Sequence, residues 1–252
     1  MSRRTLGIIL TLAVAEYRRL YGDVLLGVLW PTVRALIFVL AVYLVVFSGI
    51  RGDEFAELRF EDFLWLVSGY ACWYVISESG SKCIGIVSDS KQVVFTYGLD
   101  VLAVATRQFF LSLPTSVVLF GLVFMGMAYT GVTPPLMLCA VLAALMAHSM
   151  AVFTAIWVAY LTLMRPYFRE LFPLFFQFGF WLTPIIWEPS ESLSSLAKYN
   201  PFYQPISLIR VSGAIEIEQM LTSAAVLAGI LVMILLSVAH VRRQSKFFAD
   251  YL

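Results

Sequence analysis

The sequence predicts an all-α integral membrane protein with six transmembrane helices. Its composition is 61% hydrophobic and 13% charged, with a mean hydropathy of +0.87, whereas soluble domains carry about 25% charged residues. Residues 108–164 form a run of 57 positions without Asp, Glu, Lys or Arg. One helical crossing takes about 20 apolar residues, and the turn chemistry of this run gathers at residues 131–135. The run therefore predicts two helices in a tight hairpin.

Four further low-charge runs complete the six expected crossings. The run at 63–77 is short, but it can extend past Glu78 and Lys82, because long charged side chains reach from an apolar span to the interface. The four runs cover residues 35–50, 63–77, 171–187 and 219–239.

Lys and Arg are distributed unevenly between the expected loops. With the N-terminus inside, the inner segments carry twelve Lys or Arg and the outer segments carry four, with Arg34 at the mouth of the first span. Because basic residues favour the cytoplasmic side, we expect both termini to be cytoplasmic. The charge pattern thus predicts a protein that crosses the membrane several times.

The N-terminal segment, residues 1–30, allows two interpretations. Arg3 and Arg4 followed by an apolar run to Ala15 resemble a signal peptide. We favour an amphipathic helix at the cytoplasmic interface, because apolar residues recur beyond the basic Arg18 and Arg19. This helix would lead into the first span.

Two connecting segments are too long to be simple turns. Residues 83–100, expected on the cytoplasmic side, suit either a short helix that docks another protein or a solvated loop. Residues 188–218, expected outside, contain apolar stretches too short to cross a bilayer, so we expect external re-entrant or interfacial helices before the last span. The whole chain, 1–252, is expected to form one transmembrane domain. The candidate docking residues of the first segment are Ser88, Asp89, Ser90, Lys91 and Phe95.

The sequence lacks the usual signatures of cofactor chemistry. It contains no phosphate-binding loop of the Gly-x-x-x-x-Gly-Lys-Ser/Thr type, so any ATP use would come from a partner. His148 and His240 have no neighbouring ligands at metal spacing, and the cysteines lack metal spacing as well. The net charge of +1 gives no indication of nucleic-acid binding. We expect no metal or cofactor in this chain.

A few polar residues stand out in apolar surroundings. Glu78 and Lys82 are four residues apart, which places them on one helix face as an ion pair or as a functional pair. Arg210 lies among apolar residues, where a guanidinium is costly unless it has a carboxylate or carbonyl partner or faces a wet cavity. The abundant aromatic residues would mostly pack or face lipid, and some could line a passage for sugars.

Several short motifs lie in order along nearly the whole chain: RRLY at 18–21, LGVLWP at 26–31, GYACW at 69–73, REL at 169–171, FWLTPIIW at 180–187 and NPFYQPI at 200–206 followed by Arg210. They are similar to the permease subunits of ABC exporters for polysaccharides and polyol phosphates, the exporters of capsule, O-antigen and wall teichoic acid. The family commonly carries an Asn near the end of span two and a Phe-Pro pair in the next cytoplasmic helix, both of which this chain replaces.

The resemblance implies a function and a set of partners. It implies a location in the bacterial cytoplasmic (inner) membrane and a homodimer of permeases with a path along the two-fold axis. It also implies a separate dimeric ATPase that holds ATP and Mg, and a glycan cargo on a polyprenyl pyrophosphate lipid. The docking residues named above would then couple ATP hydrolysis to transport. Arg18, Arg19 and Arg34 would contact the lipid pyrophosphate or, equally, the headgroups of membrane lipids. The residues expected at the path or outer gate are Trp73, Trp181, Trp187, Tyr203 and Arg210.

Other functions remain open from the sequence. An ABC permease for a small amphiphile or drug shares the same six-span plan. An intramembrane enzyme acting on lipid-linked sugars would need clustered Asp, Glu or His at membrane depth, and a passive channel would need a polar helix face. The sequence has neither feature, so transport is the expected function and enzymatic activity in this chain is not.

Overall fold

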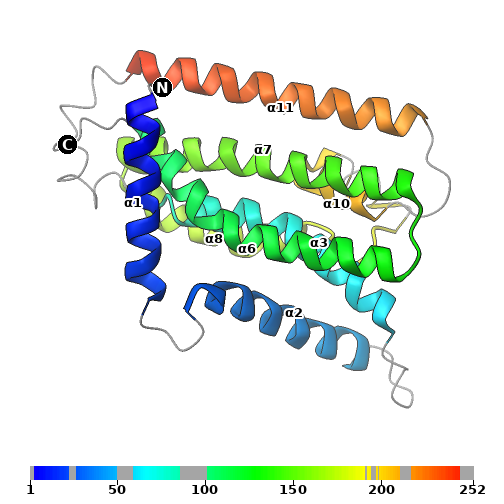
Figure 1. Ribbon diagram of the computed structural model, residues 1–252. Coiled ribbons are helices and arrows are strands. Elements are labelled where there is room, and N and C mark those ends of the chain that lie inside the picture. The colour runs from blue at the N-terminus through cyan, green and yellow to red at the C-terminus, as the bar shows by residue number, and fades with distance from the viewer. Residues whose placement is uncertain are drawn as a thin grey trace.

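The computed structural model describes residues 3–22, 27–49, 59–85, 101–190, 192–193, 197, 199–210 and 217–244. Over these residues the chain is helical and contains no β-strand. Long helices run along a common direction, and the first helix lies across one end of the bundle (Figure 1). The elements are α1 (Arg3–Tyr21), η1 (Gly27–Leu29), α2 (Trp30–Gly49), α3 (Phe60–Ser81), α6 (Val101–Tyr129), α7 (Pro134–Met164), α8 (Phe168–Leu182), α10 (Tyr203–Ile209) and α11 (Ile217–Gln244).

The start of α1 and the end of α11 lie at the same end of the bundle (Figure 1). We call this the α1 end. The long helices alternate in direction, so the start of α2, the end of α3 and the start of α6 also lie at the α1 end. The turn between α6 and α7 lies at the opposite end. The basic residues Arg18, Arg34, Lys82, Arg107 and Arg165 therefore belong to helix ends on one side of the molecule.

The hairpin predicted for residues 108–164 is confirmed. Helix α6 closes with backbone bonds from Val132 N to Met127 O and from Thr130 N to Gly126 O, each 3.0 Å. Gly131 has φ +72°, a left-handed conformation that glycine adopts at helix ends without steric cost. Helix α7 then starts with proline at its first positions, where the missing N–H would have had no partner in the helix.

Three described helices are long and apolar enough to cross a membrane. They cover residues 105–129, 134–164 and 221–244, which correspond to the predicted hairpin and the predicted last span. Helix α2 contains a shorter apolar stretch, Trp30–Val45. Helix α8 ends at Leu182, just before Thr183 and Pro184, because the residue before a proline disfavours helical geometry.

Helix α3 lies at the centre of the bundle. It packs against α2, α6, α7, α8 and α10, and its residues from Leu66 to Ile76 are almost all buried. The face of α7 carries fully buried alanines at helical spacing, and such small residues let helix backbones approach closely. These alanines are Ala140, Ala143, Ala147, Ala151, Ala155 and Ala159. Because other helices surround α3, its polar residues Ser68 and Ser79 are buried, and Ser77 and Glu78 are half-buried.

The predicted N-terminal helix is present as far as Tyr21, and η1 precedes α2. Ile9 and Ala103 form a small buried cluster between α1 and α6. Glu16 on α1 also pairs with Arg107 on α6 at 3.1 Å between Oε2 and Nη2, and both side chains are largely buried. Helix α1 is thus fastened to the start of α6 by apolar packing and by an ion pair.

Helix α11 lies on the outside of the bundle, mainly against α7. Within its apolar window, 11% of the residues are buried. Its polar link to α7 is the indole of Trp157, which donates to Ser237 Oγ at 2.9 Å. His240 stacks on the same indole with ring centroids 5.9 Å apart.

Candidate functional site

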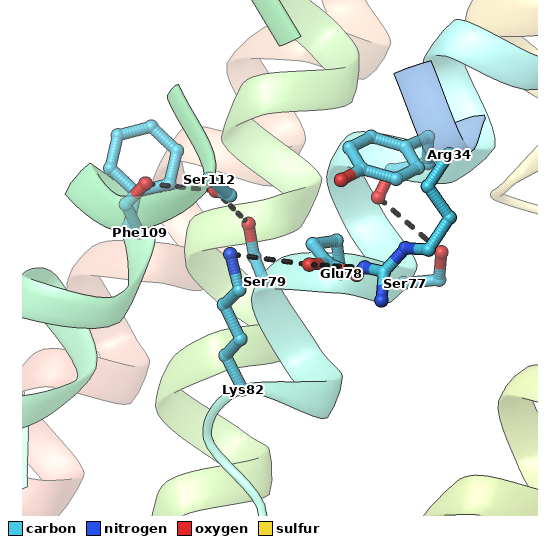
Figure 2. A network of polar contacts seen from close by, with 8 residues as sticks. Arg34, Ser77, Glu78, Ser79, Lys82, Phe109 and Ser112 are labelled. Carbon is cyan, nitrogen blue, oxygen red and sulfur yellow. Dashed lines mark hydrogen bonds and ion pairs between the residues drawn. The ribbon is translucent and has the colours of Figure 1, made fainter. Parts of the chain in front are cut away.

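A cluster of charged side chains connects α2 and α3 at the α1 end. Glu78 Oε1 lies 3.2 Å from Lys82 Nζ and 3.7 Å from Arg34 Nη2. Figure 2 shows the carboxylate of Glu78 between the two cations. The side chain of Arg34 is 60% exposed, whereas those of Glu78 and Lys82 are each 18% exposed. We call these three residues the Arg34 cluster. The i,i+4 pair predicted from the sequence is confirmed, and Arg34 joins it.

The Arg34 cluster has a net positive charge, because two cations pair with one carboxylate. That carboxylate is unfavourably placed. Glu78 lies in the last turn of α3, where the helix dipole disfavours negative charge. Its partial burial adds a desolvation cost. Lys82, the C-cap residue of α3, is placed where the dipole favours a cation. The carboxylate is therefore held by the two cations that share one of its oxygens.

Hydroxyl groups hold the end of α3 in place around this cluster. Ser79 Oγ lies 2.7 Å from Ser112 Oγ on α6, and Ser112 also donates to the carbonyl of Phe109 at 2.8 Å. Figure 2 shows Ser79 and Ser112 facing one another on the side of α3 away from Arg34. Ser77 Oγ donates to the carbonyl of Trp73 at 2.9 Å. The bond between Ser79 and Ser112 joins the end of α3 to α6, and the bond from Ser77 lies within α3.

The structure places the three predicted headgroup arginines at the α1 end. Arg18 and Arg19 are exposed in the last turn of α1, where positive charge stabilises the helix dipole. Of the three, Arg34 is the one that the structure joins to Glu78 and Lys82.

At the opposite end, Arg210 is bound by backbone carbonyls. Its guanidinium donates to the carbonyls of Pro184 at 2.8 Å, Ile185 at 2.6 Å and Trp65 at 3.2 and 3.3 Å. It also lies over the Trp65 ring, 3.4 Å from the ring centroid. Burial lowers the pKa of Arg210 to about 9, so the group stays positive at neutral pH. Arg210 thus joins α3, α10 and the segment that follows α8. The sequence left open a carboxylate partner, a carbonyl partner or a wet cavity for Arg210, and the structure gives it carbonyl partners.

The other residues expected at a path occupy different settings. Trp73 is buried in the core and packs edge-on against Phe202, with centroids 5.8 Å apart. Trp181 is exposed on α8, and its carbonyl accepts a bond from Trp187 Nε1 at 3.0 Å. Tyr203 is half-buried at the start of α10. The structure joins Trp181 and Trp187 through this bond, whereas the Trp73 ring lies in the core against Gly179 of α8.

The candidate coupling residues Ser88, Asp89, Ser90, Lys91 and Phe95 lie outside the described residues. Within the described part, the segment begins with a turn over residues 82–85, and α6 begins at Val101.

The histidines have partners inside the bundle. His148 Nε2 lies 3.0 Å from Ser116 Oγ, and its Nδ1 lies 2.7 Å from the carbonyl of Ala144. Among the described residues, no group of three or more His, Cys, Asp or Glu could hold a metal ion.

Sequence reasoning missed two pairings that shape the molecule. The Glu16–Arg107 pair joins helices that are distant in the sequence, and the two residues carry no shared motif. The stacking of Arg210 on Trp65 is likewise a long-range contact. The isolation of Arg107 and Arg210 in apolar sequence was the available signal, because a charge in such surroundings needs a partner.

Comparison with protein-family models gives no match, and comparison with curated proteins gives none either.

Proposed function

We propose that this chain is the permease subunit of an ATP-driven ABC exporter that moves a lipid-linked polysaccharide across the bacterial cytoplasmic membrane. The observation that carries the proposal is the Arg34 cluster, a net positive group at the α1 end of an apolar helical bundle. Guanidinium and ammonium groups at such a position suit the pyrophosphate of a lipid carrier. The ordered sequence motifs support the same assignment.

The proposal includes six crossings with both termini in the cytoplasm. The shared position of the start of α1 and the end of α11 supports this arrangement, as does the concentration of basic residues at the α1 end. In this topology α1 lies at the inner interface and α10 belongs to the external re-entrant segment. The α2, α3 and α8 helices would complete the crossings together with the three longer helices.

The proposal also includes a homodimer that encloses the path. Helix α8 supports it, because it carries a stripe of large apolar side chains at spacings of three and four residues, each 45 to 73% exposed. Such a stripe suits packing against another helix. Its members are Leu171, Leu174, Phe175, Phe178, Trp181 and Leu182.

ATP binding and hydrolysis would take place in a separate ATPase and reach this chain from the cytoplasm. The attachment of α1 to α6 through Glu16 and Arg107 supports α1 as one route for that motion. Residues 83–100, which connect α3 to α6 in the sequence, are the other proposed contact.

A second candidate, export of a small amphiphile, is favoured by one cavity. A pocket of about 330 Å³ lies between α7, α11 and the turn at Phe202, with an almost wholly apolar lining. Its size and lining would suit a small apolar molecule or part of a lipid chain.

Reconstitution separates the two candidates. The permease and its ATPase partner would be placed in liposomes with either a fluorescent isoprenyl-diphosphate oligosaccharide or a small amphiphilic dye. ATP-dependent movement of the oligosaccharide supports the proposed function. Movement of the dye alone would support the second candidate, and movement of neither would contradict both.

Topology can be tested by single cysteines in a variant without Cys72, Cys83 and Cys139. Cysteine at position 55 or 195 should react with an impermeant reagent from outside, and cysteine at position 90 or 245 should react from inside. External labelling at position 90 would contradict the six-span arrangement.

A further inference from the structure

The Arg34 cluster keeps a carboxylate where both the helix dipole and burial oppose it. Arg34 and Lys82 approach the same oxygen of Glu78, so two cations share one negative charge. Lys82 pairs with Glu78 within α3, and Arg34 reaches the same carboxylate from α2. The cluster therefore carries one positive charge more than its carboxylate neutralises, which favours the binding of an anion.

The two cations differ in how firmly they hold Glu78. Lys82 is 3.2 Å from the carboxylate and is shielded, whereas Arg34 is 3.7 Å away with 60% of its side chain exposed. An ion pair with a largely exposed partner contributes little to stability. Arg34 can thus exchange Glu78 for another anion at little cost, and it is accessible from outside the cluster.

We propose that Arg34 and Lys82 form a binding site for a diphosphate, and that the diphosphate competes with the carboxylate of Glu78 for these two cations. This deepens the proposed function and rests on it for the identity of the cargo. Guanidinium binds phosphate oxygens through two parallel bonds, while an ammonium group acts as a compact point charge. A diphosphate bears charges on two neighbouring phosphates and engages both cations together.

Charge distinguishes a diphosphate from an ordinary membrane phospholipid at this cluster. A phosphodiester headgroup carries one negative charge, so in place of Glu78 it would still leave one of the two cations unneutralised. A diphosphate in place of Glu78 carries enough negative charge to neutralise both cations. Glu78 then remains close to the bound phosphates, and repulsion between like charges weakens binding. The carboxylate therefore sets a moderate affinity, which lets the ligand leave after it has bound.

The test uses the purified full chain in nanodiscs of neutral phosphatidylcholine, without the ATPase. Binding of farnesyl diphosphate and of inorganic pyrophosphate would be measured by calorimetry for the original chain and for Glu78→Gln, Arg34→Gln, Lys82→Gln and Lys82→Arg. The matched control is Arg59→Gln, which removes another exposed arginine paired with a glutamate, at the opposite end.

We expect Glu78→Gln to bind both diphosphates about tenfold more tightly, because a repulsive charge is removed. Arg34→Gln and Lys82→Gln should bind at least about tenfold more weakly, since each loses a charge-assisted bond. Lys82→Arg should retain most of the affinity, and Arg59→Gln should match the original chain. Nanodiscs containing phosphatidylglycerol should leave the affinity for farnesyl diphosphate within about twofold.

Unchanged or weaker binding by Glu78→Gln, in a variant that elutes and unfolds like the original chain, would overturn the inference. Equal losses in Arg34→Gln and Arg59→Gln would show a general charge effect and overturn it as well. Strong competition by phosphatidylglycerol would identify a headgroup site instead. If the diphosphate results hold and reconstituted transport fails, the exporter proposal is wrong and the site stands. If transport works and Glu78→Gln changes nothing, the inference alone is wrong.

Discussion

Arg34 and Arg210 are both arginines in an apolar bundle, but they have different kinds of partner. Arg210 donates to the carbonyls of Pro184, Ile185 and Trp65 and covers the ring of Trp65. Arg34 is largely exposed and reaches one shared carboxylate. A backbone carbonyl cannot move without moving the main chain around it, whereas a side-chain carboxylate can turn away. The first cation is therefore suited to hold helices together, and the second is suited to exchange its partner.

Replacing Arg210 by alanine should give the largest loss of stability. The carbonyls of Pro184 and Ile185 would lose their guanidinium donors, and an unsatisfied buried carbonyl costs about 1–3 kcal/mol. Together with the lost ring contact, we expect a free-energy loss of about 3–5 kcal/mol, seen as a lower unfolding temperature in detergent and a lower abundance. Arg210→Lys should recover little, because an ammonium group lacks the planar fork.

The control is Arg59→Ala. Arg59 pairs with Glu61 at 3.5 Å on the surface, and both side chains are more than 60% exposed, so its loss should change stability little. Equal stability of the Arg210→Ala and Arg59→Ala variants would contradict the structural role and return Arg210 to the candidate path residues.

Gly69→Ala tests the same contact from the opposite side. A Cβ at Gly69 would overlap the guanidinium of Arg210, so the arginine would have to leave its carbonyls or α3 would have to shift. We expect a loss of about 1–3 kcal/mol, the usual cost of overpacking a core. Thermal unfolding in detergent measures it.

Gly121→Ala is the matched control for this substitution. A Cβ at Gly121 meets no atom within 4 Å, and alanine favours helix by about 1 kcal/mol over glycine. This variant should be as stable as the original chain or more so. A Gly69→Ala variant that is equally stable would show that Arg210 can move freely.

The sequence was most informative where a property was local. The hairpin of α6 and α7 followed from a charge-free run and its turn residues, and the Glu78–Lys82 pair followed from helical spacing. The partners of Arg210 could not be chosen from the sequence, because backbone carbonyls are the same at every residue. Arg34 was placed at a helix mouth, but its contact with Glu78 depends on how α2 and α3 pack. Helix α3 is also less apolar than the three candidate membrane spans, because the helices packed around it cover its polar residues.

Glu16→Gln should loosen α1 from α6. It leaves the largely buried Arg107 without its carboxylate, and we expect a local loss of about 1–3 kcal/mol. Faster hydrogen exchange over residues 3–21, with unchanged exchange in α7, would be the signature. The exchanged pair Glu16→Arg with Arg107→Glu should restore part of the protection. Unchanged exchange in the Glu16→Gln variant would show that apolar packing alone holds α1.

Ser79→Ala should have a smaller effect than the substitutions at Arg210, Gly69 and Glu16. It removes the 2.7 Å bond to Ser112, but Ser112 keeps its bond to the carbonyl of Phe109. We expect a loss of about 1 kcal/mol in thermal unfolding. The double variant Ser79→Ala with Ser112→Ala should lose less than the sum of the two single changes. Strict additivity would contradict the bond between the hydroxyls.

The central position of α3 has a consequence for the biogenesis of the protein. A chain is made from its N-terminus, so α3 emerges before α6 and α7, the helices that later cover it. In the proposed six-span arrangement, Glu78, Ser77 and Ser79 would during that interval face lipid or the insertion machinery without their final neighbours. We therefore predict that α3 is held weakly by the bilayer until α6 and α7 arrive to enclose it. Insertion of chains truncated after Ser81 and after Met164 would measure this dependence, and equal insertion of α3 in both would contradict it.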